Sequence, residues 1–105
     1  MAEPVVTVTE NADRERYEIT VDSVPAGFAQ YVRRGGRTLF VHTEIDAAFE
    51  GRGLGGRLVQ AALDTERDAR RQIVPLCPFV RRYVDRHNEY ADLVGTDLLD
   101  RIDPG

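Results

Sequence analysis

The residues with the clearest chemical potential form a glycine-rich segment, Glu50-Gly51-Arg52-Gly53-Leu54-Gly55-Gly56-Arg57, near the middle of the chain. Glycine lets the backbone turn with positive φ and approach a ligand without obstruction by a Cβ. The segment opens a predicted helix, whose first N–H groups and dipole attract anions such as phosphate. Arg52 and Arg57 would add charge-assisted hydrogen bonds. A tight turn without a ligand is the alternative, although four glycines in six residues would be costly for a turn alone.

Two nucleotide-binding motifs fit this segment poorly. Gly51, Gly53 and Gly56 match the dinucleotide pattern Gly-x-Gly-x-x-Gly, but such a unit follows a first strand and places an acid about 20 residues later. Here several strands of antiparallel type come first, and the window near Arg70–Cys77 holds no acid. A P-loop needs lysine beside Ser or Thr, and the sequence contains no lysine.

The first half of the chain predicts the sheet that must position this segment. Four short strands separated by turn residues indicate an antiparallel meander. Alternation puts Tyr17, Ile19 and Val21 on one face, and Gly35-Gly36 is a hairpin signal. Pro25-Ala26-Gly27 is interpreted as a break in the chain. The predicted strands are Val5–Thr9, Arg16–Val21, Phe28–Arg33 and Thr38–Ile45.

The second half predicts a helix, a strand and a further helix. The long helix runs from Gly53 to about Arg71, with Leu54, Leu58, Ala61, Ala62 and Thr65 recurring at helical spacing. Ile73–Cys77 is an apolar run typical of a buried strand, which a right-handed crossover would place parallel to the fourth strand. Pro78 suits the first turn of a helix over Phe79–Arg86, with Phe79 and Val80 in the core.

Together these elements predict an α+β fold in one domain. The expected core covers residues 5–94, with a helical turn at Tyr90–Val94. Residues 95–105 form a predicted tail, including a turn of helix at Asp97–Arg101. The chain has 105 residues, enough for one compact domain.

Composition excludes several kinds of site. A net charge of −4 gives no basic surface for nucleic acid, and the arginine clusters are interpreted mainly as solvated surface. The single cysteine, Cys77, rules out an internal disulfide, and we expect no metal site. Without a signal peptide or an apolar run of membrane-spanning length, we expect a cytoplasmic protein that does not bind membranes.

The glycine segment after a β meander resembles motif A of the GNAT superfamily of N-acetyltransferases. That motif is usually Arg/Gln-x-x-Gly-x-Gly/Ala, and Glu50, Gly53 and Gly55 occupy its places, with Glu50 departing from the usual residue. The likeness is closer to small single-domain members, carried by Phe40–Ile45, the glycine segment, Val74–Val80 and Tyr83–Val94. It implies a minimal GNAT-like fold, binding of acetyl-CoA or CoA, and a pantetheine arm between two splayed strands.

The resemblance assigns roles to particular residues. The cofactor-binding residues would be Ile45, Glu50, Gly51, Arg52, Gly53, Leu54, Gly55, Gly56, Arg57, Cys77, Pro78 and Tyr83. Transfer to an amine needs a base and an acid for the departing thiolate. His42 and Glu44 share one face of a predicted strand and are candidates for the base, with a hydrogen-bonded structural pair as the alternative.

Cys77 and Tyr83 are the other catalytic candidates. Cys77 stands just before a helix start, where it could carry a transient thioester, line the site, or serve as a buried core residue. Tyr83 could protonate the thiolate or merely pack, and His87 could complement a helix end.

Two functions follow from this reading. The first is an acyltransferase that moves acetyl from acetyl-CoA to a small-molecule or peptide amine. The second is an acyl-CoA-binding sensor with weak or no catalysis, favoured by Glu50 and by the lack of helices between the first two strands. We expect a monomer or a weak homodimer.

Overall fold

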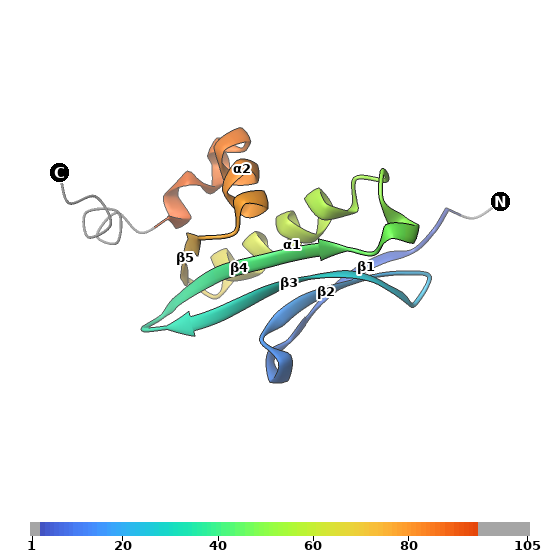
Figure 1. Ribbon diagram of the computed structural model, residues 1–105. Helices are drawn as coiled ribbons and strands as arrows, with labels where there is room; N and C mark the ends of the chain where they lie inside the picture. The colour runs from blue at the N-terminus through green and yellow to red at the C-terminus, as the bar shows by residue number, and fades with distance from the viewer. Residues whose placement is uncertain (1–2, 95–105) are drawn as a thin grey trace.

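The protein is described by a computed structural model over residues 3–94, and the predicted tail lies outside the described residues. Five strands form one sheet in the order β1-β2-β3-β4-β5, with the first four antiparallel and β5 parallel to β4 (Figure 1). The predicted α+β fold, the meander and the parallel fifth strand are confirmed. The strands are β1 Val6–Asn11, β2 Arg16–Val21, β3 Val24–Arg34, β4 Arg37–Ile45 and β5 Gln72–Pro75.

Two α-helices and three short 3₁₀ segments complete the described chain. The α-helices are α1 Leu54–Asp68 and α2 Pro78–Arg86, and the 3₁₀ segments are η1 Ala12–Arg14, η2 Ala47–Phe49 and η3 Asn88–Leu93. Figure 1 shows both α-helices on the same side of the sheet. In residues 3–94 no α-helix covers the opposite face, which we call the open face.

The predicted break at Pro25-Ala26-Gly27 is wrong. The chain turns earlier, at Asp22 and Ser23, which have φ of 50° and 68°, and β3 already begins at Val24. Pro25 pairs with Thr20 beside a bulge in β3, where Ala26 is the extra residue. Proline is tolerated at such a bulge because the hydrogen-bond ladder is already interrupted there.

Strand β5 is shorter than predicted. It ends at Pro75 rather than at Cys77. Cys77 nevertheless stays attached to the sheet, since its N–H donates to the Phe40 carbonyl at 2.8 Å before α2 begins. The chain therefore leaves the edge of β4 soon after Phe40.

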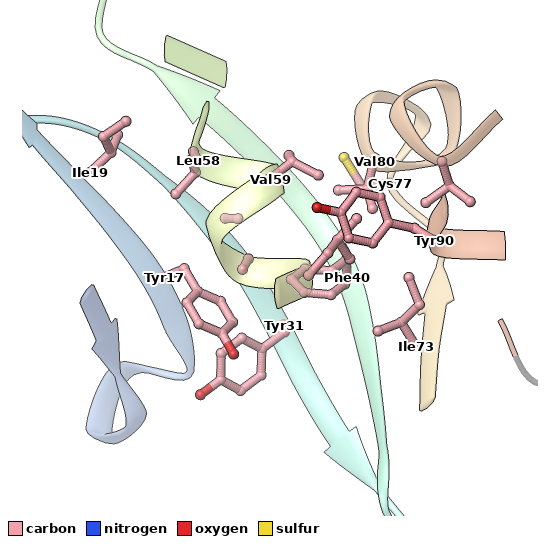
Figure 2. Close-up of a cluster of buried hydrophobic side chains, with 14 of the residues drawn as sticks. Tyr17, Ile19, Tyr31, Phe40, Leu58, Val59, Ile73, Cys77, Val80 and Tyr90 are labelled. Atoms are coloured by element: carbon pink, nitrogen blue, oxygen red, sulfur yellow. The ribbon is translucent and has the colours of Figure 1, made fainter. Parts of the chain in front are cut away.

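The core lies between the sheet and α1. Tyr17, Tyr31 and Phe40 are fully buried on three adjacent strands, with ring centroids 5.5 Å apart for the tyrosine pair and 6.2 Å for Tyr17 and Phe40 (Figure 2). Leu58 and Val59 of α1 pack into the same cluster. The predicted alternation in β2 is confirmed, because the whole Tyr17 face is buried.

The prediction that Thr65 belongs to the buried face of α1 is wrong. Thr65 is exposed and donates to the Ala61 carbonyl at 2.9 Å, whereas Glu66 is fully buried. The buried face follows Leu58, Ala62 and Glu66 at a spacing of four residues. Hydrophobicity alone could not predict this because the buried member is a carboxylate.

Glu66 is the centre of a buried polar cluster. It forms ion pairs of 2.8 Å with both Arg33 and Arg71, and it accepts a hydrogen bond from Thr38 at 2.5 Å and another from Tyr17. The interpretation of the arginine clusters as solvated surface therefore fails for Arg33 and Arg71. This polar cluster fixes the C-terminal half of α1 against the sheet.

A β-bulge in β4 decides which side chains face the helices. Phe40 pairs with Tyr31 and His42 with Gln30, so Val41 is the extra residue. A bulge shifts the alternation of the following residues. As a result Phe40 and Thr43 both lie on the helix side, whereas His42 and Glu44 lie on the open face.

Candidate functional site

The start of α1 has the geometry of an anion site. Gly51 and Gly53 have φ of 81° and 72°, and Gly53 is the N-cap. No side chain caps the helix, and its first backbone hydrogen bond joins the Arg57 N–H to the Gly53 carbonyl at 3.3 Å. Within residues 3–94 the N–H groups of the first helical turn, 54–56, donate to no protein acceptor. They remain available to a ligand, and the helix dipole favours an anion.

The four glycines of the segment meet different requirements. A Cβ at Gly51 or Gly53 would contact nothing within 4 Å, so glycine is needed there for the positive φ. A Cβ at Gly55 would lie 2.6 Å from the Phe79 ring, so glycine is needed there for close packing with α2. At Gly56 a Cβ would be 3.8 Å from the Tyr83 ring, which is ordinary contact.

A groove of about 260 Å³ runs beside Gly56, between α1 and α2. Tyr83 and His87 form a stacked pair in it, with ring centroids 4.0 Å apart. Burial, followed by the nearby carboxylates of Glu89 and Asp64, raises the pKa of Tyr83, so the phenol keeps its proton at neutral pH. The groove is lined by Gly56, Phe79, Arg82, Tyr83, Arg86 and His87.

The sequence analysis did not predict two of these residues as part of a site, and it placed a third in the core. Arg82 and Arg86 are four residues apart and so share one face of α2, a signal that helical spacing could have supplied. Phe79 was predicted to be a core residue, but it is 36% exposed because its ring covers Gly55 at the surface between the helices. Val80, by contrast, is fully buried as predicted.

The edge of β4 that faces β5 is unpaired beyond Phe40. Pairing with β5 ends at Phe40 and Pro75, and in the described part of the chain no strand adds to this edge along 41–45. Cys77 lies beside it, 4% exposed, and its thiol donates to Thr43 Oγ1 at 3.5 Å. Figure 2 shows Cys77 next to Val80 among the buried side chains.

His42 and Glu44 occupy the other face of β4. His42 Nε2 lies 3.8 Å from Glu44 Oε2, and the two side chains are 61% and 60% exposed. The His42 ring centroid is 6.0 Å from that of Phe28. The structure thus brings His42 and Glu44 together but separates them from Cys77 and Tyr83, which lie on the helix side.

The remaining predicted residues are spread around the glycine segment. Glu44, Ile45 and Glu50 line a hollow of about 960 Å³ on the open face. The Arg52 guanidinium lies 5.3 Å from the centre of the Phe49 ring, and Arg57 lines a separate hollow between α1 and β1. Pro78 is the first residue of α2.

Residues 3–94 contain neither a cluster of metal ligands nor a membrane-spanning helix. No group of three or more His, Cys, Asp or Glu side chains in this range could hold a metal ion. None of the helices in the same range is long and apolar enough to span a membrane.

The fold has a meander, a crossover helix with an uncapped glycine start and a short parallel strand, which is the arrangement that the sequence resemblance predicts for an N-acetyltransferase domain. A sequence profile of the GCN5-related N-acetyltransferase family matches residues 16–93. The chain belongs to this family, which generally uses acetyl-CoA as acyl donor. This confirms the resemblance seen in the sequence.

The same fold occurs among solved structures. The solution NMR structure of a GCN5-like protein from Staphylococcus aureus superposes with a TM-score of 0.66 at 18% identity, covering 85% of this chain and 87% of that one. At this identity the likeness concerns the fold. No curated protein matches the chain.

Proposed function

We propose that this domain transfers acetyl from acetyl-CoA to an amine and holds the pyrophosphate at the start of α1. The observation that carries the proposal is the first turn of α1, with uncapped N–H groups after two glycines of positive φ. Family membership supports acetyl-CoA as the donor. Gly51–Gly56 supply main-chain donors, with Arg52 and Arg57 as nearby cations.

The free edge of β4 extends the proposed site. An extended ligand with amide groups can add to an exposed strand edge by main-chain hydrogen bonds. Coenzyme A carries two such amides in its pantetheine arm, and the edge beyond Phe40 has no strand partner in the described residues. Cys77, Pro78 and Ile45 flank this edge.

Donor and acceptor would then approach β4 from opposite faces. In the transfer, the amine nitrogen bonds to the acetyl carbon, the carbon–sulfur bond breaks, and the amine loses a proton while the thiolate gains one. His42 and Glu44, on the open face, are proposed to take the proton from the amine. Tyr83, on the helix side and protonated at neutral pH, is proposed to supply one to the thiolate.

Cys77 is proposed to line the thioester end of the site. Its burial and its contact with Thr43 place the thiol beside the free edge of β4. A covalent role would require acetyl to pass first to the Cys77 sulfur, releasing CoA, and then to the amine. Cys77→Ala abolishes turnover if this thioester forms, and it leaves most of the activity if the thiol only lines the site.

The second candidate is an acyl-CoA-binding sensor with weak or no catalysis. Glu50 favours it, since an exposed carboxylate next to the glycine segment opposes a bound phosphate. The uncovered open face also favours it, because within residues 3–94 no α-helix covers this face to enclose an acceptor pocket.

Binding and turnover assays separate the two candidates. Titration calorimetry with acetyl-CoA tests the site, and thiol release over a panel of small and peptide amines tests transfer. If the domain is an enzyme, it should release CoA, and His42→Ala should release less CoA while keeping its affinity for acetyl-CoA. If the domain is a sensor, it should bind acetyl-CoA without releasing CoA above background. Absence of acetyl-CoA binding would contradict both.

A further inference from the structure

We infer that the groove between α1 and α2 binds the 3′-phosphate at the nucleotide end of coenzyme A, through Arg82 and Arg86. The inference rests on the proposed function and adds to it a second anion site with different residues. Coenzyme A carries this phosphate on the ribose, next to the pyrophosphate. One ligand could therefore reach both the start of α1 and the groove.

The side chains that line the groove are all basic or neutral, and the nearest carboxylates, those of Glu89 and Asp64, act on Tyr83 from outside the lining. Arg82 and Arg86 line the groove together with His87, and no carboxylate contributes to the lining. Neither arginine forms an ion pair with any residue in 3–94, whereas Arg33, Arg67 and Arg71 all have carboxylate partners. Two guanidinium groups four residues apart on one helix repel each other unless an anion lies between them. The planar guanidinium group binds phosphate through paired, charge-assisted hydrogen bonds.

The position of the groove connects it to the first anion site. Gly56 belongs to the uncapped first turn of α1 and also lines the groove. Because Gly56 has no side chain, no side-chain atom of this residue lies between the first turn of α1 and the groove. An anion held by the first turn therefore lies next to the mouth of the groove.

The other surfaces of the groove suit a ribose and a base. The stacked Tyr83 and His87 rings present an aromatic wall, and the ring of Phe79 forms the adjoining part. Such rings pack against flat or apolar ligand surfaces, and the two arginines then select for phosphate. Recognition is accordingly expected to depend on the 3′-phosphate more than on the base.

The test compares acetyl-CoA with 3′-dephospho-acetyl-CoA, which lacks only that phosphate. Titration calorimetry would measure both ligands on the unaltered protein and on Arg82→Ala, Arg86→Ala and Arg81→Ala. Arg81 is an exposed arginine of α2 outside the groove, so its variant is the matched control for lost charge.

We expect the unaltered protein to bind acetyl-CoA about tenfold more tightly than the dephospho form, as lost charge-assisted bonds imply. Arg82→Ala and Arg86→Ala should each remove most of this preference without weakening the dephospho form, and Arg81→Ala should keep it. Equal affinities for the two ligands, or a preference that survives both variants, would overturn the inference while the proposed function stood. Failure to bind either ligand would overturn both.

Discussion

At the scale of single residues, the glycine segment shows why local spacing predicts a site well. Positive φ at Gly51 and Gly53 is a requirement of the backbone, and the segment sits directly between a strand and a helix. Such features lie within a few residues of one another, so the sequence alone indicates them. Arg82 and Arg86 line the groove only because of the way α2 packs against α1, and this packing cannot be predicted from local spacing in the sequence.

Replacing Gly53 by alanine is expected to weaken acetyl-CoA binding at least fivefold, a loss of about 1 kcal/mol in binding energy. A Cβ at φ of 72° costs about 1–2 kcal/mol, and the first turn of α1 would relax away from this conformation. Calorimetry with acetyl-CoA would measure the affinity, and urea denaturation the stability.

Gly36→Ala provides the matched control for this change. Gly36 has φ of 79° in the turn between β3 and β4, with no atom within 4 Å of an added Cβ. Its substitution should therefore cost similar stability while leaving acetyl-CoA affinity unchanged. Equal affinity losses in the two variants would mean that general destabilisation, and not the loop conformation, controls binding.

At the scale of elements, α2 packs on α1 at two adjacent glycines, of which one leaves no room for a side chain and the other does. Gly55 lets the Phe79 ring lie against α1, whereas Gly56 borders open groove. Helix prediction treats both as equally unfavourable, because it considers the helix in isolation. The same limit applies to β4, where only the pairing with β3 reveals the bulge at Val41 that separates His42 from Cys77.

Gly56→Ala is expected to stabilise the fold by about 0.5–1 kcal/mol, since alanine is the better helix former and its Cβ fits. Gly55→Ala gains the same helix propensity, but it overpacks against Phe79 at a cost of about 1–3 kcal/mol. In urea denaturation, the free energy of unfolding of Gly56→Ala should therefore exceed that of the unaltered protein. The free energy of unfolding of Gly55→Ala should be equal to or lower than that of the unaltered protein.

A second substitution tests the assigned cause. Adding Phe79→Leu to Gly55→Ala should recover stability, because the shorter side chain removes the contact with the new Cβ. If Gly55→Ala alone proved as stable as Gly56→Ala, the Phe79 ring would be free to move and would not fix α2.

At the scale of the whole molecule, the cluster around Glu66 joins elements that are distant in sequence. Glu66 on α1 contacts Tyr17 of β2, Arg33 of β3 and Thr38 of β4. Arg33 also pairs with Glu10 of β1 at 2.7 Å. The sequence could not reveal this cluster, since a glutamate on a polar-looking helix is normally solvated. The sheet and the C-terminal half of α1 are thus held together by ion pairs as well as by apolar packing.

The pH dependence of stability should report on Glu66. Burial alone would raise the pKa of Glu66, but hydrogen bonds from Arg71, Thr38, Tyr17 and Arg33 outweigh it and lower the pKa to about 2. An unfolded glutamate titrates near about 4.3. Because the folded pKa is the lower one, the carboxylate stabilises the fold above pH about 4.3, and this stabilisation is lost as the pH falls towards 2.

Glu66→Gln tests this assignment by keeping the side-chain shape and removing the charge. The change leaves Arg71 without a carboxylate and Arg33 with Glu10 as its remaining partner, and it is expected to cost about 3 kcal/mol at pH 7. The variant should also lose stability less steeply than the unaltered protein between pH about 4.3 and 3, because the titrating group is gone. Urea denaturation across this range measures both effects, with the exposed Glu15→Gln as control. An unchanged slope in Glu66→Gln would show that Glu66 does not control the acid sensitivity of the fold.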